Sequence, residues 1–261
     1  MTRSLPSHSD SRGRILGGGL TRTRSKIILS SRSKIILSTV SLLAAIVLGV
    51  PAIQAARAQR RITESQNNLK QIGVGLWSYD QVHGMLPLGA DTGTDGRPRH
   101  GWQIRLLPYL EGGLFIPIDF DYAWDDPFNA PYFKLRVPIF LIPGVKRITD
   151  ERGFALSHYA ANSHVFGRDR SASLGETPET VSRTILVGEV ADGFLPWGQP
   201  GNWRDPAAGL GDSPATFGSP HPLGVQFLMG DGSVRFIERG VDQRVLKALA
   251  GPADEEGSDD G

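Results

Sequence analysis

Cysteine is absent from the 261-residue sequence, which excludes disulfide bonds and thiolate metal sites. Motifs of the common nucleotide-binding and hydrolytic sites are missing as well. There is no G-x-S-x-G, no H-E-x-x-H, no P-loop and no strand-flanked G-x-G-x-x-G. The sequence therefore predicts no catalytic residues and no cofactor, and we expect a protein that is not an enzyme.

The middle of the chain has little net charge. The excess of basic residues lies at the N-terminal end, and the excess of acidic residues lies at the C-terminal end. Residues 1–34 carry eight Lys and Arg against one Asp, residues 251–261 carry five acidic residues, and the whole chain has a net charge of +1. Both ends also lack hydrophobic periodicity, so we expect a disordered basic tail over 1–34 and a disordered acidic tail over 251–261. No basic surface remains for nucleic acid outside the first tail.

Charge is missing altogether between Lys34 and Arg57. As a helix, the apolar residues 35–56 would extend about 33 Å at 1.5 Å per residue, enough to cross a hydrocarbon core of about 30 Å. We interpret them as a transmembrane helix in contact with the lipid bilayer. Because Lys and Arg favour the cytoplasmic side, we expect a single-pass protein of the cytoplasmic (inner) membrane, with its N-terminus inside and its C-terminal part periplasmic.

A cleaved signal peptide is the alternative interpretation of the same segment, since Ala56-Arg57-Ala58 offers an A-x-A cleavage site. Two features favour retention. The apolar run exceeds the 7–15 residues that are usual in signal peptides. The helical pattern also continues beyond the site, because Ile62, Leu69, Ile72, Leu76 and Tyr79 recur at helical spacing. We expect this amphipathic helix, residues 57–84, to continue the span and to stop near Gly84.

From residue 85 to 250, Pro and Gly punctuate short apolar runs, which is typical of short strands joined by long loops. We predict strands over 104–110, 137–142, 184–190 and 225–229. Residues 184–190 should form a central strand, because both their odd-numbered and their even-numbered positions, and so both faces of the strand, carry apolar residues. Residues 168–182 should form a surface loop and 241–250 a short helix with Val245, Leu246 and Leu249 on one side. The expected fold class is α+β, a long N-terminal helix followed by an antiparallel β-rich head.

Asp231-Gly232 stands between two strand-like runs, which favours a two-residue type I′ hairpin. That register puts Met229 opposite Val234, and it predicts one buried face formed by Val225, Phe227, Met229, Val234 and Phe236. It also puts His221 opposite Asp242 as a pair that closes the hairpin. His221 and Asp231 would then lie roughly 30 Å apart, at about 3.3 Å per strand residue, and so would not share a catalytic or metal site.

A histidine, nine residues and Asp-Gly (His221, Asp231 and Gly232 here) resemble the C-terminal signature of the DUF1559 family, found in planctomycetes and related bacteria. Other segments of residues 50–250 agree with the family in order. They are Pro51-Ala-Ile-Gln-Ala-Ala-Arg, Asn67-Asn-Leu-Lys-Gln-Ile-Gly-Val-Gly-Leu, His83-Gly-Met-Leu-Pro, Leu106-Leu-Pro-Tyr-Leu, His158-Tyr-Ala-Ala-Asn and Thr184-Ile-Leu-Val-Gly-Glu.

The resemblance implies a prepilin-like N-terminus and a head similar to those of pseudopilins, the structural proteins of type II secretion. The chain departs from this pattern where prepilin-like proteins carry Gly-Phe-Thr-Leu-Val-Glu-Leu, because it has Lys34-Ile-Ile-Leu-Ser-Thr-Val-Ser-Leu-Leu instead. Processing by a prepilin peptidase and assembly into a filament therefore do not follow from the resemblance.

Three groups of side chains are candidates for a binding site. Oxygen ligands for Ca²⁺ are available in Asp119, Asp121, Asp125, Asp126 and Asn129, although the loop lacks the glycine and terminal glutamate of an EF-hand. Four tryptophans could stack on sugars if they are exposed together, and the alternative is that they fill the core. They are Trp102, Trp124, Trp197 and Trp203. Glu189, at the end of a buried strand, is a candidate for a hydrolase with His158, His164 and Asp192, or for a structural hydrogen bond.

Three functions follow from these observations. The first is a membrane-anchored, non-enzymatic structural or assembly protein of the cell envelope or secretion apparatus, with protein partners bound through the N-terminal helix. The second is an extracytoplasmic module that binds carbohydrate or another solute through the tryptophans and the acidic residues 119–129. The third, an anchored hydrolase that uses Glu189, is the weakest, since no hydrolytic motif accompanies that residue.

Overall fold

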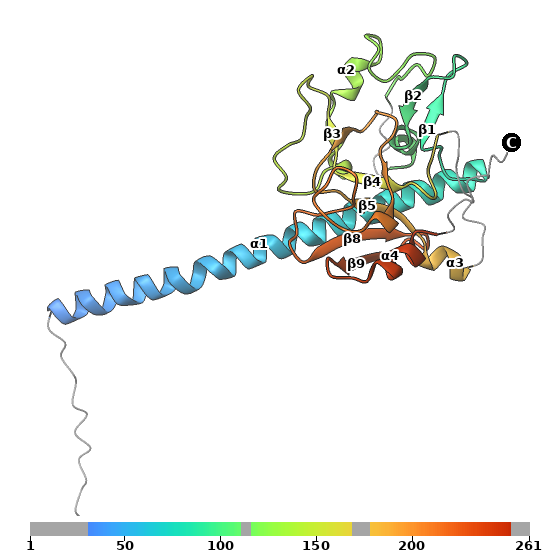
Figure 1. Ribbon diagram of the computed structural model, residues 1–261. Coiled ribbons are helices and arrows are strands. Elements are labelled where there is room, and N and C mark those ends of the chain that lie inside the picture. The colour runs from blue at the N-terminus through green and yellow to red at the C-terminus, as the bar shows by residue number, and fades with distance from the viewer. Residues whose placement is uncertain (1–30, 111–115, 169–177, 252–261) are drawn as a thin grey trace, which may run out of the picture. The chain divides into compact units, whose positions relative to one another are not determined.

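The computed structural model describes residues 31–110, 116–168 and 178–251, with side chains from residue 50 onward, apart from Pro178. The chain divides into two compact units, Met1–Ala52 and Ile53–Gly261. Residues 1–30 and 252–261 of the predicted tails lie outside the described residues, whereas residues 31–34, predicted to belong to the disordered basic tail, are helical. The elements appear in chain order in Figure 1.

The long helix that the sequence predicts is α1 (Ser31–His83). It ends where expected, because Gly84 follows with a φ of 74°, in the left-handed region that glycine favours. Residues 35–49 of the predicted span lie outside the residues whose side chains are described. Over the part of the chain that is described, no helix combines the length and the apolar character needed to cross a bilayer.

In the second unit, five strands form one sheet in the order β7-β4-β5-β8-β9. The strands are β4 (Tyr159–Asn162), β5 (Ile185–Glu189), β7 (Trp203–Arg204), β8 (Gly224–Met229) and β9 (Val234–Glu238). All neighbours are antiparallel except β4 and β7, which pair in parallel. Strand β5 is central and buried along its whole length, as its apolar sequence predicts. The head is thus α+β, with a sheet that is antiparallel apart from its short edge strand.

Smaller elements surround this sheet. Two further strand pairs are β1 (Ala90–Thr92) with β2 (Pro98–Gly101) and β3 (Leu156–Ser157) with β6 (Leu195–Pro196). The short helices are η1 (Trp102–Tyr109), α2 (Ala130–Phe133), η2 (Pro138–Phe140), α3 (Pro178–Arg183), η3 (Pro206–Ala208) and α4 (Gln243–Leu249).

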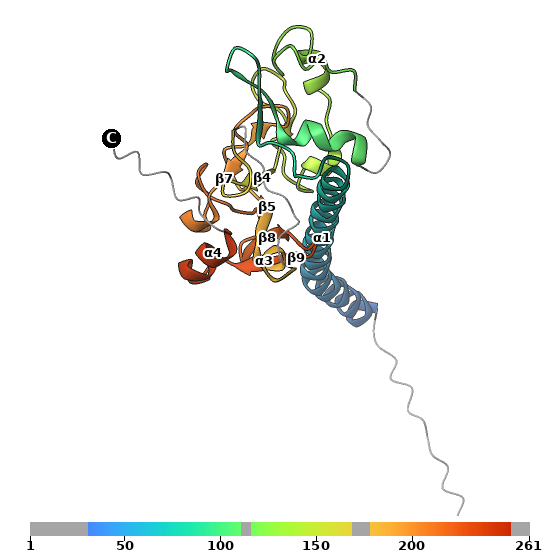
Figure 2. The same cartoon turned by 90° about the vertical axis from the view of Figure 1, so that its right-hand side faces the viewer.

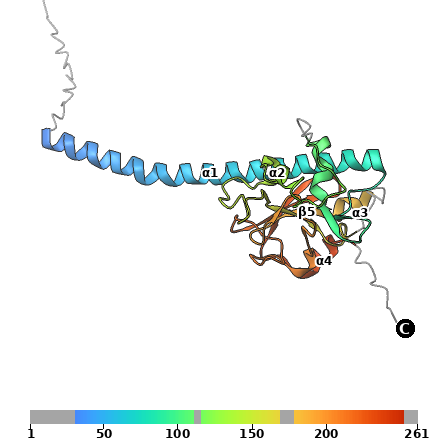
Figure 3. The ribbon, with the colours of Figure 1, turned by 90° about the horizontal axis from the view of Figure 1, so that it is seen from above.

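The sheet packs between two helices. On one face, Leu69, Ile72 and Leu76 of α1 are fully buried in a cluster that includes Leu228 of β8. On the other face, Phe227 packs in a second cluster with Leu246 of α4. Figure 2 shows α1 and α4 on opposite sides of the strands, and Figure 3 shows the C-terminal half of α1 lying along the head. Burial of one such side chain stabilises the fold by about 1.5–3 kcal/mol, so the second half of α1 is part of the core.

Two predicted strands are wrong, since nearly all of residues 104–110 lie in the 3₁₀ helix η1 and half of residues 137–142 lie in the 3₁₀ helix η2. Pro108 and Pro138 stand inside these segments, and proline lacks the N–H that a central strand needs. A short apolar run is also ambiguous, because periodicity alone does not separate a buried strand from a buried helical turn. The predicted loop 168–182 is wrong at its end, where α3 begins, and residues 169–177 lie outside the described residues. The C-terminal helix is confirmed as α4, although Val245 is exposed.

The hairpin between β8 and β9 forms, but its predicted register is wrong by one residue. Leu228, not Met229, pairs with Val234, because the loop holds three residues instead of two. Gly232 N donates to Met229 O and Met229 N to Ser233 O, and Gly232 adopts a φ of 78°. A three-residue hairpin loop that ends in a left-handed glycine is one of the common hairpin connections. The shift gives Ile237 the buried position opposite Val225 and leaves Phe236 43% exposed.

Candidate functional site

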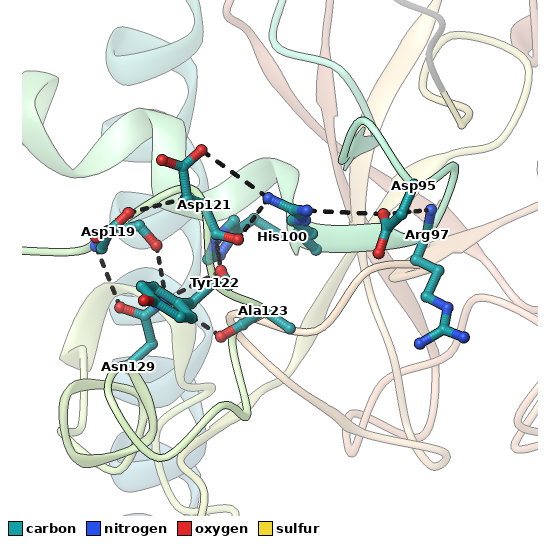
Figure 4. A network of polar contacts seen from close by, with 9 residues as sticks. Asp95, Arg97, His100, Asp119, Asp121, Tyr122, Ala123 and Asn129 are labelled. Atoms are coloured by element: carbon teal, nitrogen blue, oxygen red, sulfur yellow. Dashed lines mark hydrogen bonds and ion pairs between the residues drawn. The ribbon is translucent and has the colours of Figure 1, made fainter.

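The acidic loop that was a candidate for Ca²⁺ is organised around Asn129, as Figure 4 shows. Asn129 is fully buried, and its Nδ2 donates to the carbonyl oxygens of Asp119, Tyr122 and Ala123 at 2.8–3.1 Å. Its Oδ1 accepts from Asp119 N at 3.2 Å. The side-chain oxygen of Asn129, which was a candidate ligand for Ca²⁺, is therefore used in a hydrogen bond that holds the loop together.

The carboxylates of this loop are directed to other partners. Those of Asp119 and Asp126 accept backbone N–H groups two residues ahead, at 2.9 Å. The carboxylate of Asp125 lies 3.5 Å from an Arg152 nitrogen, and that of Asp121 lies 4.0 Å from one of Arg99. The described ranges contain no group of three or more His, Asp or Glu side chains placed to hold a metal ion. The geometry gives the calcium prediction no support.

The four tryptophans divide between the core and a half-buried position. Trp102 and Trp197 are fully buried, Trp124 is nearly so, and Trp203 is half-buried. The indole N–H of Trp197 donates to Leu135 O at 3.0 Å and that of Trp102 to Asn202 O at 3.1 Å. These side chains fill the space beneath the long loops, so together they do not form an exposed surface for sugars.

The two ends of the signature motif lie on either side of β8. His221 precedes the strand and Asp231 follows it in the hairpin loop, where its Oδ1 accepts from Ser233 N at 2.9 Å. Since β8 has six residues, it accounts for about 20 Å of the path between them at 3.3 Å each. The predicted pairing of His221 with Asp242 is wrong, because Asp242 caps α4 by accepting from Arg244 N at 2.8 Å. His221 packs edge-on against Phe236 instead.

A pocket lies at the His221 end of β8, beside α1, with a cavity volume of about 150 Å³. Its polar lining comes from Ser65 and Arg61 of α1, Glu189 of β5, Gln226 of β8, and Ser219 and His221 of the preceding loop. Its apolar lining comes from Ala58, Ile62, Ile142, Pro143, Pro220 and Pro222, and Gly144 completes it. The signature histidine and the strand-end glutamate therefore meet in one site.

Glu189 is the centre of this site and is only 2% exposed. Ser65 donates to its Oε1 at 2.5 Å and Gln226 N to its Oε2 at 3.1 Å. The Ser65 hydroxyl also lies 2.9 Å from the hydroxyl of Tyr159 on β4. One network of hydrogen bonds thus connects α1 to three adjacent strands, β4, β5 and β8.

The ionisation of this network follows from its burial. Burial raises the pKa of Glu189, while hydrogen bonds from Ser65, Ser219 and Gln226 N and the nearby His221 act in the opposite direction. Burial also raises the pKa of Tyr159, with the Glu189 charge adding to the effect. Tyr159 therefore keeps its proton and remains available as a donor to Ser65.

The residues that stand near Glu189 in the sequence serve other contacts. His158 Nδ1 accepts from Ile142 N at 2.9 Å, and its Nε2 lies 2.8 Å from Arg147 O. Burial lowers the pKa of His158, which favours the neutral ring. His164 lies 2.9 Å from Asp205, and Asp192 lies 3.6 Å from Arg147. The fold therefore does not form the candidate site of Glu189 with His158, His164 and Asp192.

Sequence reasoning missed Ser65 and Gln226, although each leaves a signal. Ser65 stands four residues before Leu69, in phase with the buried stripe of α1, so a polar group faces the sheet. Gln226 interrupts the apolar run of β8 between Val225 and Phe227 and is 3% exposed. A polar residue on a buried stripe implies a buried partner, and here that partner is Glu189.

The raised pKa of Glu189 predicts a pH-dependent stability difference between the wild type and Glu189→Gln. Because the folded pKa exceeds the ordinary value of 4.5, the carboxyl group favours folding below about pH 4.5, and this contribution is lost as the pH rises through the folded pKa. Glutamine does not ionise, so the stability of the variant relative to wild type should increase as the pH rises above 4.5. Denaturant unfolding of residues 53–261 between pH 4 and 8 measures this difference.

Glu179→Gln on the exposed surface of α3 is the matched control, since the Glu179 side chain is 81% exposed. Its stability relative to wild type should stay constant over the same range. A constant difference for Glu189→Gln as well would contradict a raised pKa in the folded state.

Comparison with known proteins places the chain in a family. The family described as "Protein of unknown function (DUF1559)", SBP_bac_10, matches residues 54–176 and 147–244. These ranges include most of α1 beyond the predicted span, the pocket and the signature motif. No curated protein and no solved structure matches the chain. Because the match extends over well more than half of the sequence, the chain belongs to the DUF1559 family of proteins of unknown function.

Proposed function

We propose that this chain is a membrane-anchored, non-enzymatic structural protein of the cell envelope, similar to pseudopilins and suited to a secretion apparatus. In this proposal its N-terminal helix lies in the cytoplasmic membrane, its N-terminus is inside, and its head is displayed on the periplasmic side. The observation that supports it is the extent of α1, Ser31–His83. One helix includes both the uncharged residues 35–56 and the stripe Leu69, Ile72 and Leu76, which is fully buried in the head.

The polar network supports a structural role. Glu189 accepts a hydrogen bond from the Ser65 hydroxyl of α1, and Gln226 Nε2 donates to Ile62 O of the same helix at 3.1 Å. These contacts, together with the apolar stripe, hold the helix against the sheet. A helix that is held in the core of the head in this way suits a protein that works by assembly.

Partner binding through the helix is supported by its exposed apolar residues. Ile53, Val74 and Val82 are 53%, 61% and 65% exposed. At 100° per residue, they fall within an arc of about 80° on the helix surface. Polar residues lie on the same arc between them, namely Arg60, Glu64, Asn67, Gln71 and Ser78, so this side of α1 is a mixed surface with separate exposed apolar positions. We infer that protein partners contact α1 along this side, through both its apolar and its polar groups.

Sodium carbonate washing of membranes from a Gram-negative host that expresses the full chain tests the anchor. The wild type should remain in the membrane pellet, and protease added to spheroplasts should digest the head. Ile46→Arg should shift a large share of the chain into the wash or block its export, because an arginine at the centre of a span costs about 2.5–3.5 kcal/mol.

Val74→Arg is the control, since it introduces the same charge on the exposed surface of α1 within the head. This variant should stay in the pellet like the wild type. Release of the wild-type chain into the carbonate wash would overturn the proposal.

A further inference from the structure

We propose that the pocket beside α1 binds a small organic cation through a primary ammonium group, held by the carboxylate of Glu189 and the side-chain oxygen of Gln226. This site goes beyond the anchoring function, because its residues belong to the head alone. It gives the protein a ligand class that the structural role does not require.

Glu189 has no ion-paired counterion, although His221 is near enough to lower its pKa. Its carboxylate accepts hydrogen bonds from neutral groups of Ser65, Ser219 and Gln226. Among the described residues, no Lys, Arg or His nitrogen forms an ion pair with it. Arg61 also lines the pocket, but its side chain lies against Gly144, where a Cβ would come within 2.7 Å of Arg61 Nε. A buried carboxylate without a cation is costly, so a ligand that supplies one gains affinity.

The side chain of Gln226 carries a hydrogen-bond acceptor that has no donor. Gln226 Nε2 donates to Ile62 O at 3.1 Å and lies 3.5 Å from Glu189 Oε1. Since both of these atoms are acceptors, the orientation of the amide is fixed, and Oε1 is the remaining atom. This oxygen is buried and accepts no hydrogen bond from the residues that the structure describes. An ammonium ligand that shifts the side chains covering this oxygen would satisfy it together with Glu189.

The shape and lining of the pocket select the kind of cation. A primary ammonium group carries three donors, which match Glu189, Gln226 Oε1 and a serine hydroxyl of the lining. A quaternary ammonium has no N–H and would leave Gln226 Oε1 unpaired. Calcium takes six to eight oxygen ligands, more than one carboxylate and one amide supply. Ala58, Ile62, Ile142 and Pro143 offer apolar contacts for a short aliphatic chain attached to the ammonium group.

Isothermal titration calorimetry of the full chain in non-ionic detergent micelles, with n-propylammonium chloride as the probe, tests this site. Saturable binding in the millimolar range is expected, which is typical for so few heavy atoms. Propan-1-ol and propionate, which have similar size but lack the ammonium group, should not bind. Glu189→Gln should weaken binding at least tenfold, whereas Glu179→Gln on the exposed α3 should leave it unchanged.

A second variant keeps the test informative if Glu189→Gln disturbs the fold. Ala58→Phe fills the pocket from the exposed surface of α1 and should abolish binding while the thermal unfolding midpoint is retained. Ala55→Phe, on the same helix but outside the pocket lining, should bind like the wild type. Absence of saturable binding up to 100 mM probe, or equal binding by wild type and Ala58→Phe, would overturn the proposal.

Discussion

Replacement of Ile72 by alanine is expected to reduce the free energy of unfolding of the head by about 2–5 kcal/mol, the range for truncating a buried isoleucine. Ile72 is fully buried between α1 and the sheet, in the cluster that contains Leu228 of β8. Its loss removes apolar contacts and leaves a cavity that the neighbouring strand fills only in part. Urea unfolding of residues 53–261, followed by far-UV circular dichroism, measures the effect.

Val74→Ala is the control for this prediction, because Val74 lies two residues away on the same helix and is 61% exposed. Its unfolding free energy should change by less than about 0.5 kcal/mol, since surface substitutions have small effects and alanine favours helix. Equal losses in the two variants would mean that the buried face of α1 is not the one described, and the helix would then not be part of the core.

Trp197→Ala is expected to have the other large effect, a loss of about 3–5 kcal/mol in the free energy of unfolding, as for other buried aromatic residues. The indole is fully buried, its ring centroid lies 4.5 Å from that of Phe133, and its N–H donates to Leu135 O. Removal leaves a large cavity and an unpaired carbonyl. Thermal and urea unfolding of residues 53–261 measure the loss.

Trp203→Ala provides the comparison, because Trp203 is half-buried and packs only at the border of the same core. Its loss should be clearly smaller than that of Trp197→Ala. If Trp197→Ala were instead as stable as wild type, the indole would not be filling the core, and a role for it in ligand binding would have to be reconsidered.

The elements that the sequence predicts correctly are those with a strong local pattern. The stripe Leu69, Ile72 and Leu76 has helical spacing, and Gly84 marks the end of the helix. Residues 184–190 are apolar on both parities and form the central strand β5. In these cases the periodicity and the tertiary burial favour the same element, so one sequence is enough to find it.

The errors arise where several local solutions fit the same residues. Asp231-Gly232 is compatible with a two-residue loop and with a three-residue loop that includes Gly230. The choice depends on which register buries more apolar surface of β9. In the observed register, Ile237 takes the buried position that was expected for Phe236. A slip of one residue moves every side chain of that strand to the other face, so the predicted buried set was wrong in its second half.

The pocket was beyond sequence reasoning, because its members are distant in the chain. Ser65 and Glu189 are 124 residues apart, and no local pattern relates them. The sequence predicts that Glu189 ends a buried strand, but the candidate partners that it offers, His158, His164 and Asp192, are not the residues that contact Glu189. The antiparallel pairing of β5 with β8 brings it to Gln226 instead, and the packing of α1 on the sheet brings it to Ser65.

In the proposed function, the apolar N-terminal segment stays joined to a helix which is itself part of the head. Intact-mass spectrometry of the chain recovered from expressing cells shows whether this connection is retained. We predict a membrane-bound species close to the 28.3 kDa of the whole sequence, with no more than the initiator methionine removed. A soluble species that begins near Gln59 would contradict the claim, because cleavage there separates the head from any anchor.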